Sequence, residues 1–163
     1  MTNSALLPGE HPGIENAIAH RDDITVHHRI YGWLVDESVP PALTTAERRA
    51  LVDLDWDGSH ELGTAEADAM RDELLEYMEA QALSVQVRSG WYAQGTEPEP
   101  EEFRITLSVG GPTLTLEGEL DRYGSPCAAQ LRYSWYSRSE CLPLVGTEAD
   151  ALVWFACQLV SLA

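Results

Sequence analysis

FRITLSVGGPTLTLEGELDRYGSPCAAQLRYSW, residues 103–135, alternates apolar and polar side chains in three successive runs. A period of two places each apolar set on one face of an extended strand. The runs are separated by Gly-Gly-Pro at 110–112 and by residues 121–126, both rich in residues that favour tight reversals. The stretch therefore predicts three consecutive strands joined by hairpins.

The flanking sequence adds a fourth strand and a helix. A run that begins at Leu83 and continues to Trp91 also alternates apolar and polar residues. Together the runs predict a four-stranded antiparallel β-meander over about residues 83–136, with one apolar face. A helix is expected over about residues 147–162. Its segment 151–157 is apolar all round, which is typical of a helix packed between a sheet and other helices.

The region before the sheet, about residues 14–81, carries helical periodicity. The helices expected there are 14–20, 22–34 (capped by Asp22 and Asp23), 46–53 (capped by Thr44 or Thr45) and 65–81 (capped by Thr64). The first dozen residues are expected to form a loose arm. The chain is thus predicted to be a single α+β domain, residues 1–163, with N-terminal helices, a four-stranded antiparallel β-meander and a C-terminal helix packed on the sheet.

Composition bounds the environment of the protein. A chain of 163 residues with 44% hydrophobic content can bury a core of its own. It has no apolar run of the roughly 20 residues that a membrane span needs, and its N-terminus does not resemble a secretion signal. Cys127, Cys141 and Cys157 lack CxxC spacing and are expected to be reduced thiols packed as small apolar residues. We therefore expect a soluble cytoplasmic protein.

Negative charge is the unusual property of this chain. It has 27 acidic and 10 basic residues, all of the latter Arg, and a formal net charge of −17. Such a charge repels nucleic acid and anionic membranes, so direct binding to either is not expected. It favours association with a strongly basic protein surface, although acidity can also serve solubility alone.

Over half of this charge is concentrated between residues 53 and 79, where ten carboxylates are opposed by one Arg. Asp68, Asp72 and Glu76 lie four residues apart on one side of a predicted helix, so their axial spacing is about 6 Å. The stretch also contains Trp56, and Trp is often an interface anchor. The predicted partner-binding residues are Asp53, Asp55, Trp56, Asp57, Glu61, Glu66, Asp68, Asp72, Glu73, Glu76 and Glu79. Tyr77 in the same stretch is expected to pack in the core.

Part of the chain resembles a known family. The segment from Leu83 to Trp135, with Val-Gly-Gly-Pro at 109–112 and Gly-Glu-Leu-Asp at 118–121 followed by Gly124 and Pro126, resembles a family of short acidic accessory proteins of bacterial mobile elements and phages. The likeness ends after Trp135. It implies a mobile-element context, in which small acidic proteins often inhibit host defence as anti-CRISPR or anti-restriction proteins.

Catalytic and metal chemistry find no support in the sequence. The segment Asp53 to Gly58 matches the start of a calcium-binding EF-hand loop, but His60 and Thr64 occupy positions that need an apolar residue and a bidentate Glu. His27 and His28 are adjacent, and adjacent helical residues point to different sides, so they are not expected to share a metal. No nucleophile or phosphate-binding motif is present. We predict no enzyme, no catalytic residue, no metal site and no cofactor.

The sequence thus favours an inhibitor that acts by DNA mimicry, binding the basic nucleic-acid-binding surface of a host defence protein with its acidic helix. Two alternatives stay open. The protein could dock on a defence component through exposed aromatic residues or through a sheet face that carries Arg88, Arg104 and Arg132 together with Glu117, with its acidity incidental. It could also be a non-catalytic interaction or regulatory module of a mobile element whose acidity serves solubility only. The oligomeric state and the target are left open.

Overall fold

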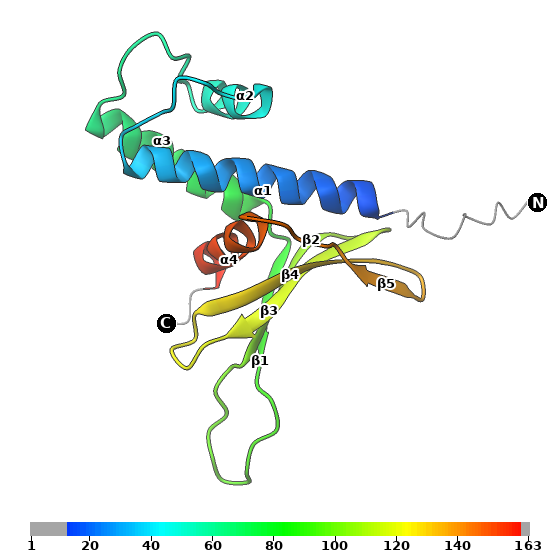
Figure 1. Ribbon diagram of the computed structural model, residues 1–163. Helices are drawn as coiled ribbons and strands as arrows, with labels where there is room; N and C mark the ends of the chain where they lie inside the picture. Colours follow the sequence, from blue (N-terminus) through cyan, green and yellow to red (C-terminus); the bar gives the residue numbers. More distant parts are fainter. Residues whose placement is uncertain (1–12, 161–163) are drawn as a thin grey trace, which may run out of the picture.

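A computed structural model describes residues 13–160 of the chain; the expected N-terminal arm lies outside the described residues. The fold is α+β, as predicted, with four helices and a five-stranded antiparallel sheet in this range (Figure 1). The elements are α1 (Ile14–Val35), α2 (Thr45–Asp53), α3 (Thr64–Ala80), β1 (Ser84–Arg88), β2 (Glu102–Ser108), β3 (Thr113–Leu120), β4 (Pro126–Trp135), β5 (Arg138–Cys141) and α4 (Glu148–Leu159). Over the described residues, no helix is long and apolar enough to cross a membrane.

The sheet is a meander in the order β1-β2-β3-β4-β5, and every neighbouring pair is antiparallel. The predicted number of four strands is wrong, because β5 extends the sheet beyond residue 136. Trp135 pairs with Arg138 across a two-residue turn in which Tyr136 has a φ of 52°. The sequence Tyr-Ser carries no signal for such a turn, and β5 is exposed and polar, so no apolar alternation marks it.

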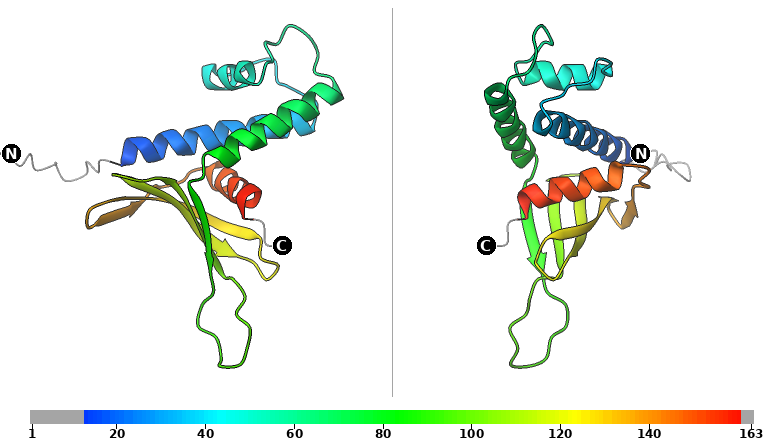
Figure 2. Two further views of the ribbon diagram at one scale, coloured as in Figure 1. Left: turned by 180° about the vertical axis from the view of Figure 1, so that it is seen from behind. Right: turned by 60° about the vertical axis from the view of Figure 1, so that its left-hand side comes forward.

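The apolar alternation of the central strands forms one buried face. Ile105, Leu116 and Leu131 lie opposite one another on β2, β3 and β4 and are fully buried. α4 packs on this face against β4 and contacts α1 on its other side, so it lies between the sheet and the N-terminal helices as expected (Figure 2). Trp91, expected to continue the pattern of β1, lies beyond the strand and is fully exposed.

α1 is a single helix of 22 residues and not the two helices predicted. The predicted break at Asp22 and Asp23 does not occur, and the Thr25 hydroxyl donates to the Arg21 carbonyl within the same turn at 2.8 Å. The buried stripe continues past this point through Ile24 to Leu34. An acidic pair in the middle of a helix is compatible with helical structure when a buried stripe runs through it.

α2 is held on α1 by its first turn. Thr44 caps the helix in a capping box: Glu47 donates its backbone N–H to the Thr44 hydroxyl at 3.2 Å, and its carboxylate accepts from the Thr44 backbone at 2.7 Å. The same carboxylate pairs with Arg29 of α1 at 2.8 Å although the Glu47 side chain is buried. Burial raises the pKa of Glu47, but the hydrogen bonds from Thr44 and the charge of Arg29 outweigh it, and the pKa lies below its ordinary value.

The remaining helix ends differ from the prediction by a few residues. α3 begins at Thr64 with Gly63 as its N-cap, and the described part of α4 ends at Leu159. The three cysteines are free, as expected, but exposed and not packed in the core. Cys127 lies near the start of β4, and Cys141 is the last residue of β5.

We predict that Gly118→Ala destabilises the protein by about 2–3 kcal/mol in urea unfolding. A Cβ at Gly118 would overlap the Ala128 carbonyl oxygen and approach the Phe103 ring to 2.6 Å. The matched variant is Gly32→Ala in α1, whose Cβ would meet nothing within 4 Å outside its own helix. It should stabilise the protein by up to about 1 kcal/mol, because Ala is the better helix former. Equal effects of the two changes would contradict the packing of Phe103 over Gly118.

We also predict that Glu47→Gln costs about 1–2 kcal/mol at pH 7. Because the pKa of folded Glu47 is lowered, its charge stabilises the fold above the unfolded-state pKa. This contribution is lost as the pH falls through the folded-state pKa. The difference in free energy of unfolding between the two proteins should therefore shrink from pH 7 into the acid range. A difference that stays constant with pH would show that the carboxylate charge does not hold α2 on α1.

Candidate partner-binding site

The carboxylates of α3 lie on its outer side. Ala67, Met70, Leu74 and Met78 form its buried side, and α3 packs alongside α1 (Figure 2). The opposite side is exposed, in agreement with the amphipathic pattern of the sequence. The exposed acidic residues of α3 are Asp68, Asp72, Glu73, Glu76 and Glu79. We call these five residues the acidic surface of α3.

Few cations neutralise this surface. Asp68 pairs with Arg71. Glu66, in the first turn of α3, accepts from His60 Nε2 at 2.8 Å. Asp53, at the end of α2, lies 3.9 Å from the exposed Arg49. Within residues 13–160, the structure shows no ion pair for the other four carboxylates of the acidic surface of α3, Asp72, Glu73, Glu76 and Glu79. Their charge is therefore available to a partner.

The turn between α2 and α3 is built as a helix C-cap and not as a calcium loop. Asp55 has a left-handed φ of 61°, and its N–H donates to the Val52 carbonyl at 3.0 Å, while the N–H of Trp56 donates to the Leu51 carbonyl at 3.0 Å. This pair of bonds is the Schellman motif, in which the residue after the left-handed position packs on the helix. Asp57 accepts from the backbone N–H of Ser59 at 2.8 Å.

The acidic groups of this turn do not gather around a common point. Hydrogen bonds from the side chain and backbone of Ser59 lower the pKa of Asp57. Over residues 13–160, no group of three His, Cys, Asp or Glu side chains is placed to hold a metal ion. The Asp57 carboxylate binds the local backbone, and Asp55, Asp57 and Glu61 are exposed at the end of the molecule that α2 forms (Figure 1).

Trp56 and Tyr77, the two aromatic residues of the acidic stretch, have the opposite exposure to the one expected: Trp56 is buried and Tyr77 is exposed. Trp56 is only 8% exposed and packs in the core, so it is not an exposed anchor on the acidic surface of α3. Tyr77 is 44% exposed, donates to Asp23 at 3.3 Å and lies against the His27 ring at 4.8 Å. Partial burial and the charge of Asp23 raise the pKa of Tyr77. A partner on α3 can therefore reach Tyr77 directly.

The two adjacent histidines point to different neighbours, as expected. His27 is buried and its Nδ1–H donates to the Asp23 carbonyl at 2.8 Å. His28 lies against Trp154 of α4 with ring centroids 5.2 Å apart, and burial lowers its pKa while Asp150 opposes that shift. The histidines thus serve the packing of α1 on α3 and α4.

The uncovered face of the sheet brings together the residues named in the first alternative. Arg104 and Arg132 both donate to Glu117, at 2.8 and 3.0 Å, and Arg88 pairs with Glu102 on the same face. Burial raises the pKa of Glu117, but the two guanidinium groups outweigh it and the pKa is lowered. These Arg side chains are already paired with carboxylates of the same face, so they offer less free charge than α3.

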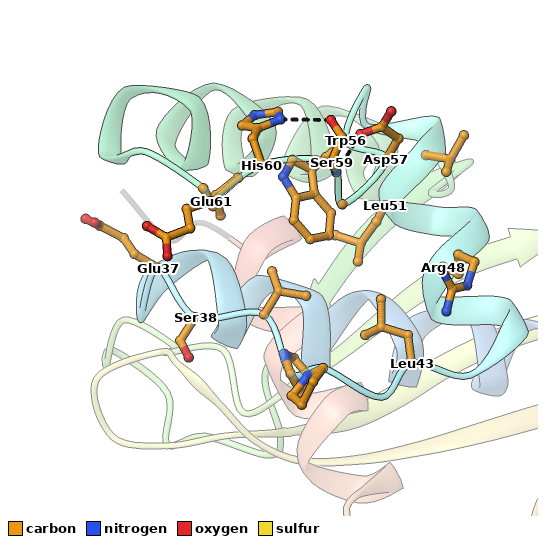
Figure 3. A pocket seen from close by; sticks show the side chains of 16 residues that line it. Glu37, Ser38, Leu43, Arg48, Leu51, Trp56, Asp57, Ser59, His60 and Glu61 are labelled. Atoms are coloured by element: carbon orange, nitrogen blue, oxygen red, sulfur yellow. Dashed lines mark hydrogen bonds between the residues drawn. The ribbon is translucent and has the colours of Figure 1, made fainter.

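The structure adds two features that the sequence did not indicate. Trp91 and Tyr92 are exposed in the loop between β1 and β2, which extends away from the body of the molecule (Figure 1). A pocket of about 700 Å³ lies between the α1–α2 and α2–α3 connections and is lined on one side by Trp56 (Figure 3). Pro40 and Pro41 form part of its wall. Pocket formation needs both connections, which are separated in sequence.

Comparisons with protein-family models, with curated proteins and with solved structures find no match for this chain.

We predict that Asp55→Gly stabilises the protein by about 0.5–1 kcal/mol, because Gly adopts the left-handed conformation without a steric cost. Asp53→Gly removes the same charge two residues earlier, within the last turn of α2. It should destabilise by a similar amount, because Gly is unfavourable in a helix. Thermal unfolding measures both changes. Destabilisation by Asp55→Gly would contradict the C-cap role of this residue. A rise in Tm on adding millimolar Ca²⁺ that is lost in Asp55→Gly would assign Asp55 to a calcium site.

Proposed function

We propose that this protein is a non-catalytic inhibitor that binds a basic, nucleic-acid-binding surface of another protein through the acidic surface of α3 and the adjoining α2–α3 turn. The observation that carries the proposal is the row of exposed carboxylates on α3 without ion pairs within the described residues. In its specific form, the partner is a cytoplasmic host defence nucleoprotein, and the inhibitor acts as an anti-CRISPR or anti-restriction protein. That form also rests on the resemblance of residues 83–135 to accessory proteins of mobile elements.

The spacing of the carboxylates supports competition with nucleic acid. Asp68, Asp72 and Glu76 repeat every four residues along α3, which corresponds to about 6 Å. Consecutive phosphates of one DNA strand are separated by a comparable distance, and the Arg and Lys side chains that bind them are unpaired when the nucleic acid is absent. An acidic helix can form ion pairs with these Arg and Lys side chains, since their binding to phosphates does not depend on the bases.

The overall charge supports the same mode of binding. A net charge of −17 steers the protein toward a basic surface and away from nucleic acid itself. Attraction of this kind weakens with salt, because ions screen exposed charges over about 8–10 Å at physiological ionic strength. The Arg-bearing face of the sheet is the weaker candidate, since Arg104 and Arg132 are already paired with Glu117.

The test is displacement of labelled duplex DNA from purified CRISPR effector complexes and restriction enzymes. We expect the protein to displace the duplex at low salt, and less as salt rises. The triple variant Asp68→Lys, Asp72→Lys, Glu76→Lys should lose about tenfold or more in potency, because repulsion replaces attraction at the contact. Glu97→Lys, Glu99→Lys, Glu101→Lys is the matched control: it changes the net charge equally but on the β1–β2 loop, and it should keep most of the potency.

Three results would contradict the proposal. Equal loss in the two triple variants would show that net charge alone matters and not the surface of α3. Displacement that does not respond to salt, and that is lost instead on substituting Arg104 and Arg132, would assign binding to the sheet. If the protein displaces DNA from none of these complexes, the result would favour the alternative of an interaction module whose acidity serves solubility only.

A further inference from the structure

The pocket beside Trp56 is formed by three segments. Its walls come from the loop that follows α1, from α2, and from the α2–α3 turn (Figure 3). Its volume of about 700 Å³ is within the range of ligand-binding pockets. Glu37 closes one end, where its carboxylate accepts from the Thr64 hydroxyl at 3.1 Å and so ties the end of α1 to the start of α3. The pocket is thus part of the folded structure.

Trp56, one of the residues that line this pocket, carries a buried donor. Trp56 is 8% exposed, and its Nε1–H has no hydrogen-bond partner within residues 13–160. The far edge of its ring lies beneath Gly58, where a Cβ would be 3.6 Å from the ring, and Figure 3 shows the nitrogen on the side of Glu61. An unpaired buried N–H costs about 1–3 kcal/mol. An acceptor that enters the pocket would recover this free energy.

Trp154 provides the comparison. Its Nε1–H is also buried and unpaired over the described residues. However, its ring lies against those of His28 and Tyr31, at centroid distances of 5.2 and 5.3 Å, within the contact between α4 and α1. Of these two indole groups, that of Trp56 therefore belongs to a residue that lines the pocket.

The lining of the pocket indicates the chemistry of its occupant. Glu37, Asp57 and Glu61 are exposed carboxylates of the lining, and Arg48 is the one Lys or Arg side chain among the lining residues. This excess of negative charge disfavours a phosphate or another anion and favours a cation. Val39 and the two prolines that follow it add an apolar wall, on which the aliphatic part of a long basic side chain can pack.

We propose that this pocket binds an extended peptide segment that carries Lys or Arg, with a backbone carbonyl of the peptide accepting from Trp56 Nε1–H and the basic side chain lying between Glu37 and Glu61. A carbonyl acceptor, an aliphatic stem and a cation occur together in such a segment. The inference rests on the proposed function, because it names the second element by which the same basic partner is held. The pocket recognises a peptide, whereas the acidic surface of α3 attracts the charge of a folded surface.

The experiment is a titration of the full ¹⁵N-labelled chain, followed through the indole N–H signals of its five Trp residues. The probe is a blocked decapeptide of alternating Arg and Ala. We expect the Trp56 signal, identified by its loss in Trp56→Phe, to move downfield and saturate while the Trp154 signal stays in place. Glu61→Gln, which leaves the core unchanged, should weaken the binding of the peptide by about tenfold.

The controls separate this inference from the proposed function. The Lys variant of Asp68, Asp72 and Glu76 should still bind the peptide in the pocket, so failure of that variant in DNA displacement leaves the pocket unaffected. A Trp56 signal that does not move overturns the inference. Equal movement with the corresponding Glu-Ala peptide or with inorganic phosphate also overturns it, because the pocket would then not select a cation.

Discussion

The burial of α4 between the sheet and α1 is the interaction on which the other parts of the structure depend. Ala151, Leu152, Phe155 and Ala156 of this helix are completely buried. A sheet with one apolar face needs a covering layer, and a helix that is apolar on most sides needs two. α4 meets both needs at once, because it contacts β4 below and α1 above. Removing it would expose the apolar side of the meander together with one side of α1, and α2 and α3 would lose the support on which they pack.

In this arrangement the fold does not require particular side chains on the outer side of α3. The helix is held by Met70, Leu74 and Met78, each of which contributes about 1.5–3 kcal/mol when it is buried. Repulsion between like charges one turn apart costs only a few tenths of a kcal/mol for each pair. The fold therefore tolerates a row of carboxylates that it does not need. The composition of that row can follow the requirements of a partner, and this is the physical basis for placing the partner-binding surface on α3.

Local patterns predicted the elements whose cause is local. The strands β2, β3 and β4 follow from alternation between turn sequences, and α2 follows from the cap at Thr44, one of the two caps expected for it. The continuity of α1 could not be predicted in this way, because Asp22 and Asp23 are good caps in isolation and only the buried stripe beneath them keeps the helix unbroken. β5 was missed for the corresponding reason: an exposed polar edge strand is defined by its pairing with β4.

The sequence by itself determined the α+β class, the amphipathic character of α3 and the local excess of carboxylates between residues 53 and 79, because these depend on periodicity and composition. Only the tertiary structure decided which aromatic side chain is buried and which is exposed. Trp56 follows a left-handed residue that turns it onto Leu51, whereas Tyr77 is left at the edge of the contact between α3 and α1. It also decided that Glu37, Arg48 and Glu61 surround one pocket, because the two connections and α2, all within residues 37–62, enclose it only after α2 docks on α1.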